Sequence, residues 1–484
     1  MGDFNLPVVA LSLLLAFFIG SLVKGVLYNL YLHPLADIPG PKLAAASFLY
    51  QTFFSLSGGK SRYYIKVAEL HEQYGPVVRI TPHEVHLSDP AHYDVMYSVG
   101  SKYAKSMAYY GALGAGYSTF VSSTAEVHKP RRAKLDPFFS RRMVLSLEHL
   151  VQSRAEKLCQ IITSRFSKSQ AVDLYHAFRS ISVDVISDYA FGESYELLAR
   201  DDLGKEFFDD LAGLGPTWWV FQQLPAVQKF ALSLPIPIAK AMSKPLKQLL
   251  ECAERAKAQV LVIKAKMDAG EKVEKPCIFE SLLSPDEGYV IPSPDQIKDE
   301  AYAILNAASD TTGNAMTVAA YNVVTNPEIY RALTAELKEA FPNPGEKLDF
   351  MKLEKLPYLT GVIKEGLRLS FGVPGRLPRV VPYPGATFNG YFLPPGKFDP
   401  TRWLDPKETR RIEKVFVPFS KGSRACAGIN LAYCELYLTL GTLFRRFENL
   451  TANHLTGEDL AYNDYFSAQT PLTATKFHVT ERKE

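Results

Sequence analysis

One cysteine, Cys426, stands between two small residues in the segment FSKGSRACAGINLAYCE, which runs from Phe419 to Glu435. The chain has five cysteines, and no two of them have the CxxC spacing of zinc ligands and redox motifs. This sparse usage indicates a reducing compartment and provides no disulfide framework. The segment therefore indicates the chemistry of a single thiolate, placed in a glycine-containing loop just before a helical pattern.

A second group of polar residues lies in the segment NAASDTT, at the centre of a long helical pattern. Asp310 and Thr311 bring an acid and a hydroxyl to one turn, beside the small Ala307 and Ala308. A threonine hydroxyl can bond the carbonyl four residues back, here that of Ala307, which loosens and bends a helix. An ordinary polar patch on a helix surface is the alternative interpretation.

The helix that carries this segment has clear start signals. Ser293 is a good N-cap and Pro294 suits the first helical position. The pattern can continue to about Thr325. Elsewhere, Glu365 and Arg368 are three residues apart and share one face of a helix, a spacing that is also common in solvated ion pairs.

Taken together, these segments resemble the cytochrome P450 superfamily of haem-thiolate monooxygenases over nearly the whole chain. The matching elements follow the family's order, and the cysteine loop matches at every position. They are HKPRRAKLDPFFS with His128 and Arg132, ASDTT, KEGLR with Glu365 and Arg368, FDPTRW with Arg402, and the loop with Phe419, Gly422, Arg424, Cys426 and Gly428. In its general sequence features the chain resembles microsomal fungal enzymes that oxidise terpenoid secondary metabolites, such as trichodiene oxygenase.

The resemblance implies that Cys426 is the axial thiolate ligand of haem b. A thiolate gives the iron electron density that favours O–O cleavage. Gly422 and Gly428 then let the backbone come close to the porphyrin, and Arg424 is placed to meet a haem propionate with its planar fork. The family pattern assigns further haem contacts to Phe419, His128, Arg132 and Arg379.

By the same resemblance, Asp310 and Thr311 deliver protons for oxygen activation, with Thr311 hydrogen-bonded to dioxygen and Asp310 linked to solvent. The family usually has glycine where this chain has Ala308. Glu365 and Arg368 are expected to join Arg402 in a buried network that braces the cysteine loop.

The composition and the net charge of the chain argue against one class of binding partner, nucleic acid. Of the 484 residues, 47% are hydrophobic and 22% are charged, which is ordinary for a globular protein. The 54 basic and 51 acidic residues leave a net charge of only +3, which argues against nucleic acid as the main partner.

The N-terminus is the one strongly apolar region. The run from Leu6 to Val23 carries no charge and is just long enough to cross the hydrocarbon layer as a helix. A cleaved signal peptide and a buried helix are the alternatives, but Asp3 precedes the run where a signal peptide has basic residues. Lys24 favours a cytosolic position for the following flank. We therefore predict a single-pass anchor and flank over residues 1–32, in the endoplasmic reticulum membrane.

Residues 33–484 are predicted to form one cytosolic catalytic domain. Helical spacing dominates, for example in LEHLVQSRAEKLCQIITSRF and LPYLTGVIKEGLRLSF. Strand-like segments are short and include VVRITP, HEVHLS and RVVPYPGATFNGYFLP. The predicted fold class is mainly α with small β-sheets, the cytochrome P450 fold behind an N-terminal transmembrane helix.

The segment from Gly215 to Met242 is aromatic and apolar. It could roof an apolar substrate pocket and dip into membrane lipid, or its aromatic residues Trp218 and Trp219 could be plain core. Tyr109 and Tyr110 are weaker candidates for the pocket wall.

One junction departs from the family. A strand and a short helix usually precede the Phe-x-Pro-x-Arg segment, but here only Lys397 separates Gly396 from Phe398. We expect a family-relative deletion near 396–398, which is either a gene-model error or the mark of an enzyme that no longer binds haem properly.

The leading hypothesis is a haem-thiolate monooxygenase that inserts one atom of dioxygen into an apolar, terpenoid secondary metabolite. Electrons would come from NADPH through a separate cytochrome P450 reductase, because the chain has no flavin or dinucleotide fingerprint. The alternatives are a haem-deficient, inactive variant and a reductase-independent haem-thiolate isomerase.

Overall fold

The structure is a computed structural model, and it describes residues 6–56, 61–213, 215–271, 277–286, 289–343, 345–377, 379–380, 409, 413 and 416–482. The chain forms two compact units. Among the described residues, the first unit ends at Val95 and the second begins at Met96.

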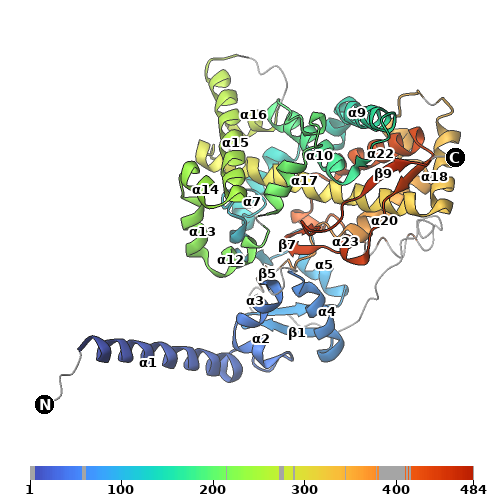
Figure 1. Cartoon of the computed structure of the whole chain (residues 1–484). Coiled ribbons are helices and arrows are strands. Elements are labelled where there is room, and N and C mark those ends of the chain that lie inside the picture. The colour runs from blue at the N-terminus through green and yellow to red at the C-terminus, as the bar shows by residue number, and fades with distance from the viewer. Residues whose placement is uncertain are drawn as a thin grey trace. The chain divides into compact units, whose positions relative to one another are not determined.

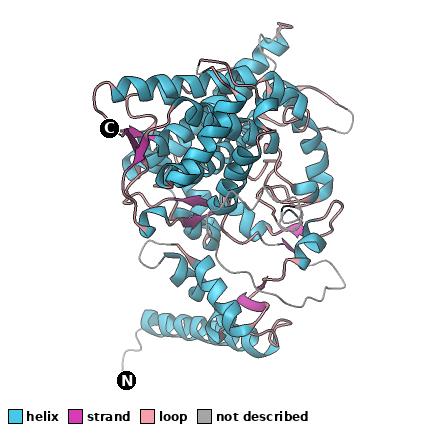
Figure 2. Ribbon diagram, turned by 90° about the vertical axis from the view of Figure 1, so that its right-hand side faces the viewer, coloured by secondary structure: helices cyan, strands magenta, loops and turns pink. Residues whose placement is uncertain are grey.

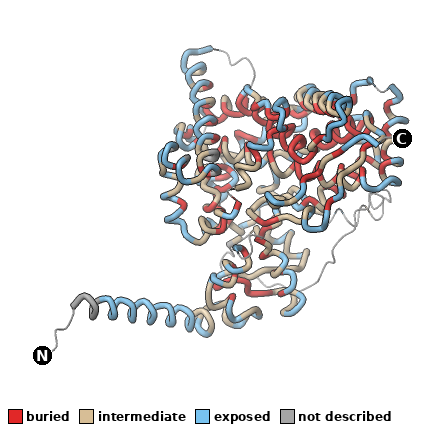
Figure 3. Tube along the Cα trace, in the orientation of Figure 1, coloured by how far each residue is buried: buried red, intermediate tan, exposed pale blue. Residues whose placement is uncertain are grey.

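The first unit begins with a long apolar helix. Its elements are α1 (Leu6–Leu27), the π-helix η1 (Tyr28–Leu32), α2 (Lys42–Ala46), α3 (Leu49–Leu56), α4 (Tyr63–Tyr74), β1 (Val77–Thr81), β2 (Glu84–Leu87) and α5 (Ala91–Tyr97), whose end reaches the second unit. The segment Leu11–Leu32 is long and apolar enough to cross a membrane, with a mean hydropathy of 2.0 and no part of it buried. Figure 3 shows this helix exposed along its described length. Lys24 lies within α1 rather than after its end.

A buried arginine holds the segment that follows this helix. The Arg79 guanidinium donates hydrogen bonds to the backbone carbonyls of Asn29 (2.9 Å), Leu35 (3.2 Å) and Pro82 (2.8 Å). Burial lowers the pKa of Arg79. Because these carbonyls come from the exit of the apolar helix and from the β1–β2 turn, Arg79 fixes the proline-containing segment against the hairpin within the first unit.

The second unit is mainly helical, as Figure 2 shows by colour. Its helices are α6 (Met107–Tyr110), η3 (Gly111–Leu113), α7 (Ala125–Leu135), α8 (Arg141–Ser146), α9 (Glu148–Phe166), α10 (Leu174–Phe191), η4 (Leu197–Ala199), α11 (Lys205–Ala212), α12 (Thr217–Gln223), α13 (Pro225–Leu232), α14 (Ile236–Met242), α15 (Lys244–Asp268), α16 (Ile278–Leu283), α17 (Pro294–Thr325), α18 (Pro327–Ala340), α19 (Phe350–Leu353), α20 (Pro357–Ser370), η6 (Gly422–Arg424), α22 (Ile429–Arg446) and α23 (Gly457–Leu460).

The strands are short, and the pairs that join them are all antiparallel among the described residues. In the second unit they are β3 (Ala104–Lys105) with β5 (Arg379–Val380), β4 (Val172–Asp173) with β9 (His478–Glu481) and β6 (Leu450–Ala452), and β7 (Asn463–Tyr465) with β8 (Ser467–Gln469). The predicted strands VVRITP and HEVHLS form the β1–β2 hairpin. Of the predicted RVVPYPGATFNGYFLP, the described part is β5. The predicted fold class, mainly α with small sheets, is confirmed.

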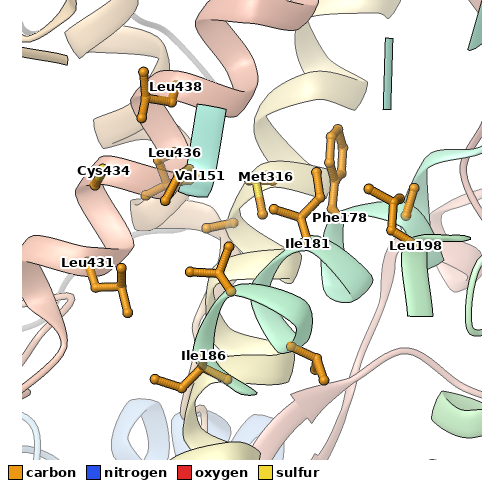
Figure 4. Close-up of a cluster of buried hydrophobic side chains, with 14 of the residues drawn as sticks. Val151, Phe178, Ile181, Ile186, Leu198, Met316, Leu431, Cys434, Leu436 and Leu438 are labelled. Carbon is orange, nitrogen blue, oxygen red and sulfur yellow. The ribbon is translucent and has the colours of Figure 1, made fainter. Parts of the chain in front are cut away.

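Helices α9, α10, α17 and α22 supply side chains to one large core (Figures 1 and 4). Two glycines allow the helices to approach closely. A Cβ on Gly313 of α17 would lie 2.6 Å from Cγ of Arg179 on α10. A Cβ on Gly366 of α20 would lie 2.8 Å from that of Ala319. These contacts hold α17 firmly between its neighbours.

The limits of α17 agree with those predicted from the sequence. Ser293 caps the helix, its hydroxyl accepts a hydrogen bond from the Gln296 N–H, and the Gln296 side chain accepts one from the Ser293 N–H. Pro294 is the first helical residue and Thr325 the last. The polar centre of this helix is therefore part of one continuous element.

A buried carboxyl on α22 gives a pH-dependent prediction. Burial raises the pKa of Glu435 from 4.5 to about 7, although Ser182 Oγ donates a hydrogen bond to it at 2.6 Å. The folded state therefore holds this proton over a pH range in which the unfolded state has lost it. The free energy of unfolding therefore falls as the pH rises from about 4.5 to 7. Above pH 7 the total loss is about 3 kcal/mol.

We expect Glu435→Gln, which keeps the acceptor oxygen, to raise the thermal unfolding midpoint at pH 8 and to have a smaller effect at pH 5.5. Scanning calorimetry at both values measures the difference. A variant destabilised equally at both would contradict the prediction.

Candidate functional site

The cysteine loop is held by its own backbone and by a glycine that admits no side chain. The Cys426 N–H donates to the Phe419 carbonyl at 2.9 Å, which closes the loop. Gly422 has φ +72°, and a Cβ there would lie 2.1 Å from the Tyr97 carbonyl oxygen. Only glycine fits such a conformation and contact, so the sequence at this position follows from the geometry.

Cys426 is accessible to solvent although protein atoms surround it. Its side chain is exposed, yet desolvation by surrounding protein raises the pKa of its thiol. A hydrogen bond from the Gly428 backbone and the positive charge of Arg132 act in the opposite direction and favour a thiolate. The remaining cysteines, Cys159, Cys252, Cys277 and Cys434, are buried and free, as expected.

A cluster of cations lies close to this loop, and we call it the basic cluster. Its members are Lys105, His128, Arg132, Arg379 and Arg424. Burial, then Arg379, Arg424 and Arg132, hold the pKa of Lys105 well below its usual range. Burial and the charges of Arg424, Arg132 and Lys105 lower the pKa of His128 to about 3. Burial, with Arg379 and Arg132 among the charges, lowers the pKa of Arg424 to about 10.

Neighbouring cations and burial set the electrostatics of Lys105, His128 and Arg424. Arg132 pairs with the exposed Asp136, while no carboxylate contributes to the shifts of Lys105, His128 or Arg424 among the described residues. Like charges this close repel unless an anion enters between them. The cluster is therefore suited to a dianionic group.

Backbone carbonyls and a phenol orient these cations. Arg424 donates to the carbonyls of Ser122 (2.8 Å), Ser123 (2.9 Å) and Thr124 (3.0 Å), just before α7. Arg132 on α7 donates to the Ala425 carbonyl at 2.8 Å, next to Cys426. The cysteine loop and α7 are thus tied together from both sides.

Arg379 and Lys105 are opposite one another in the β3–β5 pair. Arg379 Nη1 donates to the Tyr110 hydroxyl at 2.7 Å, and Lys105 Nζ donates to the Phe120 carbonyl. The structure brings together His128, Arg132, Arg379 and Arg424, the four residues predicted to contact haem propionates. The sequence analysis did not predict Lys105 as a member of this group. Its position opposite Arg379 depends on the pairing of β3 with β5, which the sequence of neither strand reveals.

The centre of α17 contains the hydrogen bond that was predicted between a threonine hydroxyl and the carbonyl four residues before it. Thr311 Oγ1 donates to the Ala307 carbonyl at 2.8 Å, and Ala307 is exposed in the middle of a mostly buried helix. Asp310 Oδ1 accepts a hydrogen bond from Arg179 Nε at 3.1 Å. Arg179 is 1% exposed and also donates to the Tyr175 carbonyl at 3.0 Å. Asp310 is therefore held by a buried cation that the sequence did not predict.

Glu365 and Arg368 form a bidentate pair on α20. Arg368 Nε and Nη2 each donate to one Glu365 oxygen at 2.8 Å, and the Glu365 side chain is fully buried. Arg402, the predicted third member, lies outside the described residues, as does the expected deletion near 396–398.

The sequence profile of the family named Cytochrome P450 matches residues 41–397 and 392–471. The chain belongs to the cytochrome P450 family. Cytochrome P450s are oxygen-incorporating oxidoreductases that use haem b with an axial cysteine thiolate. The residues of this cytochrome P450 fit that group, because an accessible thiol beside a cluster of basic side chains suits an iron and two propionates.

Curated relatives are fungal cytochrome P450s. The chain is 34% identical over 94% of both chains to cytochrome P450 monooxygenase macH of Penicillium terrestre. It is 32% identical over 94% of both chains to tryptophan 6-hydroxylase fscE of Fusarium equiseti. It is 32% identical over 90% of this chain and 92% of the relative to conidiogenone synthase PchP450 of Penicillium rubens. Relatives in secondary metabolism, including terpenoid-related ones, agree with the class of enzyme expected from the sequence.

Proposed function

We propose that this cytochrome P450 is a membrane-anchored monooxygenase that inserts one oxygen atom into an apolar terpenoid, with electrons from NADPH delivered by a separate reductase. The observation that carries the proposal is the accessible thiol of Cys426 beside the basic cluster, whose Arg132 donates to the adjacent Ala425 carbonyl. Bound haem supplies oxygen activation, and the thiolate supplies the electron density for it.

The chain's own residues then have separate tasks. Cys426 is the axial ligand, and Phe419, Gly422 and Gly428 shape its loop. The propionates are bound by the basic cluster of Arg424, His128, Arg132, Arg379 and Lys105. The loop is braced by Glu365, Arg368 and Arg402. The basic cluster gains most from this binding, since burial and mutual repulsion lower the pKa values of Lys105, His128 and Arg424, and two carboxylates would offset the repulsion.

A cluster of buried aromatic side chains is an argument for an apolar substrate. Tyr109, Tyr110, Trp218 and Trp219 are buried together, with Phe466 packed against them. Arg379 of the basic cluster donates to the Tyr110 hydroxyl, so these rings lie next to the proposed haem cradle. Trp218 and Trp219 are thus core residues, and they also form a wall near the site.

The surface beyond these tryptophans supports contact with lipid. Leu224, Phe230, Ile238 and Met242 on and before α13 and α14 are 50–63% exposed. Large exposed apolar side chains favour a membrane surface. With α1 as anchor, we place the protein on the endoplasmic reticulum membrane, with its catalytic unit in the cytosol.

The test uses purified full-length protein, reductase and NADPH. We expect a thiolate-type ferrous carbon-monoxide spectrum and reductase-dependent oxygenation of a sesquiterpene or diterpene panel. Product without reductase would favour an isomerase, and the absence of a haem band would favour a haem-deficient variant. Turnover of tryptophan but of no terpenoid would contradict the substrate class, since both kinds of relative are known.

A second prediction concerns the proton-delivery pair. Asp310→Asn and Thr311→Val are each expected to reduce oxygenated product per NADPH consumed by about 100-fold, because positioned acid–base groups typically contribute 100-fold or more. Product and hydrogen peroxide are measured together, with Asp295→Asn in the first turn of the same helix as the control. Unchanged coupling in both variants would contradict these roles.

A further inference from the structure

A buried carboxylate on α17, Glu300, has no part in the site described above. It lies ten residues before Asp310, about 15 Å along the helix at ~1.5 Å per residue. Its side chain is 4% exposed, and it forms no ion pair with another described residue. A buried carboxylate needs hydrogen bonds in place of water, so its partners indicate its task.

Those partners lie in the loop of residues 117–124, which we call the strap. Glu300 Oε2 accepts hydrogen bonds from the Thr119 N–H (2.6 Å) and the Thr119 hydroxyl (2.9 Å). The adjacent Asp299 accepts one from the Tyr117 N–H at 3.0 Å. Two neighbouring carboxylates, Asp299 and Glu300, therefore fasten the start of the strap to α17.

The other end of the strap holds cations of the basic cluster. Its last three carbonyls, those of Ser122, Ser123 and Thr124, accept the hydrogen bonds of Arg424. The Phe120 carbonyl, in between, accepts from Lys105. The strap thus places two of the side chains that face the proposed propionates.

The two ends are joined inside the strap. The Ser122 hydroxyl donates to the Thr119 carbonyl at 2.7 Å. A continuous series of contacts therefore runs from Glu300 through Thr119 and Ser122 to Arg424. If Glu300 releases Thr119, a buried backbone N–H loses its acceptor, and the strap must shift to find another.

We propose that Glu300 is a positioning residue for the haem propionates, which keeps Arg424 and Lys105 in place by fastening the strap to α17. The proposal rests on the proposed function, since it takes haem as the bound group. Glu300 acts through the strap and not through contact with haem. Its hydrogen-bond acceptor matters, and its charge does not.

The test compares two variants of the purified full-length haem protein. Glu300→Gln keeps an acceptor oxygen for Thr119, whereas Glu300→Ala removes it. We expect Glu300→Ala to release haem to excess apomyoglobin about tenfold faster than the parent, and Glu300→Gln to stay within about twofold. Asp295→Ala is the control, because Asp295 is on the same helix but pairs with Lys257 at the surface.

Hydrogen exchange of the haem-loaded protein supplies a readout independent of haem release. Peptides covering 117–124 should exchange faster in Glu300→Ala and normally in Glu300→Gln, with peptides of α9 unchanged in both. Faster exchange throughout the chain would mean general loosening and would overturn the proposal. Equal haem loss from both Glu300 variants would assign the effect to charge and would also overturn it.

A double variant separates this proposal from the proposed function. Glu300→Ala combined with Arg424→Lys should lose haem less rapidly than the two single effects multiplied, since both act on one contact. Multiplicative effects would overturn the strap. Normal haem retention in Arg424→Lys alone would contradict the propionate cradle itself, whatever Glu300 does.

Discussion

We expect replacement of Cys426 by serine to abolish the red-shifted Soret band of the ferrous carbon-monoxide complex. Serine has nearly the same size, but its hydroxyl does not ionise as a thiol does and donates far less electron density. We expect residual haem, if bound through the basic cluster, to show an unshifted band, and NADPH-dependent product to fall below detection. Absorption spectroscopy of the reduced, carbon-monoxide-treated protein is the measurement.

Cys434→Ala is the matched control. Cys434 lies two turns further along, on α22, and is fully buried. Its substitution leaves the thiolate in place and should preserve the shifted band. A shifted band in Cys426→Ser, or its loss in Cys434→Ala alone, would contradict the assignment of the axial ligand.

Glu365→Gln is expected to destabilise the second unit by about 3–5 kcal/mol, because it leaves the charge of Arg368 without its buried partner. Both carboxylate oxygens of Glu365 accept hydrogen bonds from Arg368, and the carboxylate itself is fully buried. Thermal unfolding and haem content measure the effect. The surface pair of Lys338 with Glu448, each about half exposed, provides Glu448→Gln as a control expected to change stability by under ~1 kcal/mol.

Removing both charges tests whether the loss of stability comes from the unpaired charge of Arg368. In Glu365→Gln/Arg368→Gln the charge of Arg368 is removed together with that of its partner, so we expect the double variant to recover part of the lost stability. If the double variant is destabilised by the sum of the two single effects, the cost does not come from an unpaired charge. The prediction would then be wrong even if Glu365→Gln is strongly destabilised.

Most helices could be predicted from the sequence, because their signals are local. Ser293 and Pro294 mark the start of α17, and the spacing of apolar residues marks its course to Thr325. The Thr311 hydroxyl bond to Ala307 was also predictable, since both residues lie on one turn of one helix. The aromatic segment after Gly215 gave two interpretations, and burial of Trp218 favours core at that position.

The surroundings of Asp310 show where sequence reasoning stops. Nothing near it in the chain indicates a partner, yet Arg179, which lies on another helix, reaches it because Gly313 leaves room. Glu300 and its strap partner Thr119 are even farther apart in the sequence, by 181 residues against 131 for Arg179 and Asp310. Such pairs depend on which helix faces pack together, and single residues do not encode that choice.

The sequence by itself determined the glycine-containing loop that carries Cys426, the helix that follows it and the limits of α17. These features depend on neighbouring residues, through backbone conformation and short-range hydrogen bonds. Only the tertiary structure decided that Arg132 and Arg379 lie close enough to Lys105, His128 and Arg424 for their charges to add to the effect of burial, which lowers the pKa of each of those three groups. Coulombic interaction depends on distance in space, and the fold alone brings together charges that are far apart along the chain.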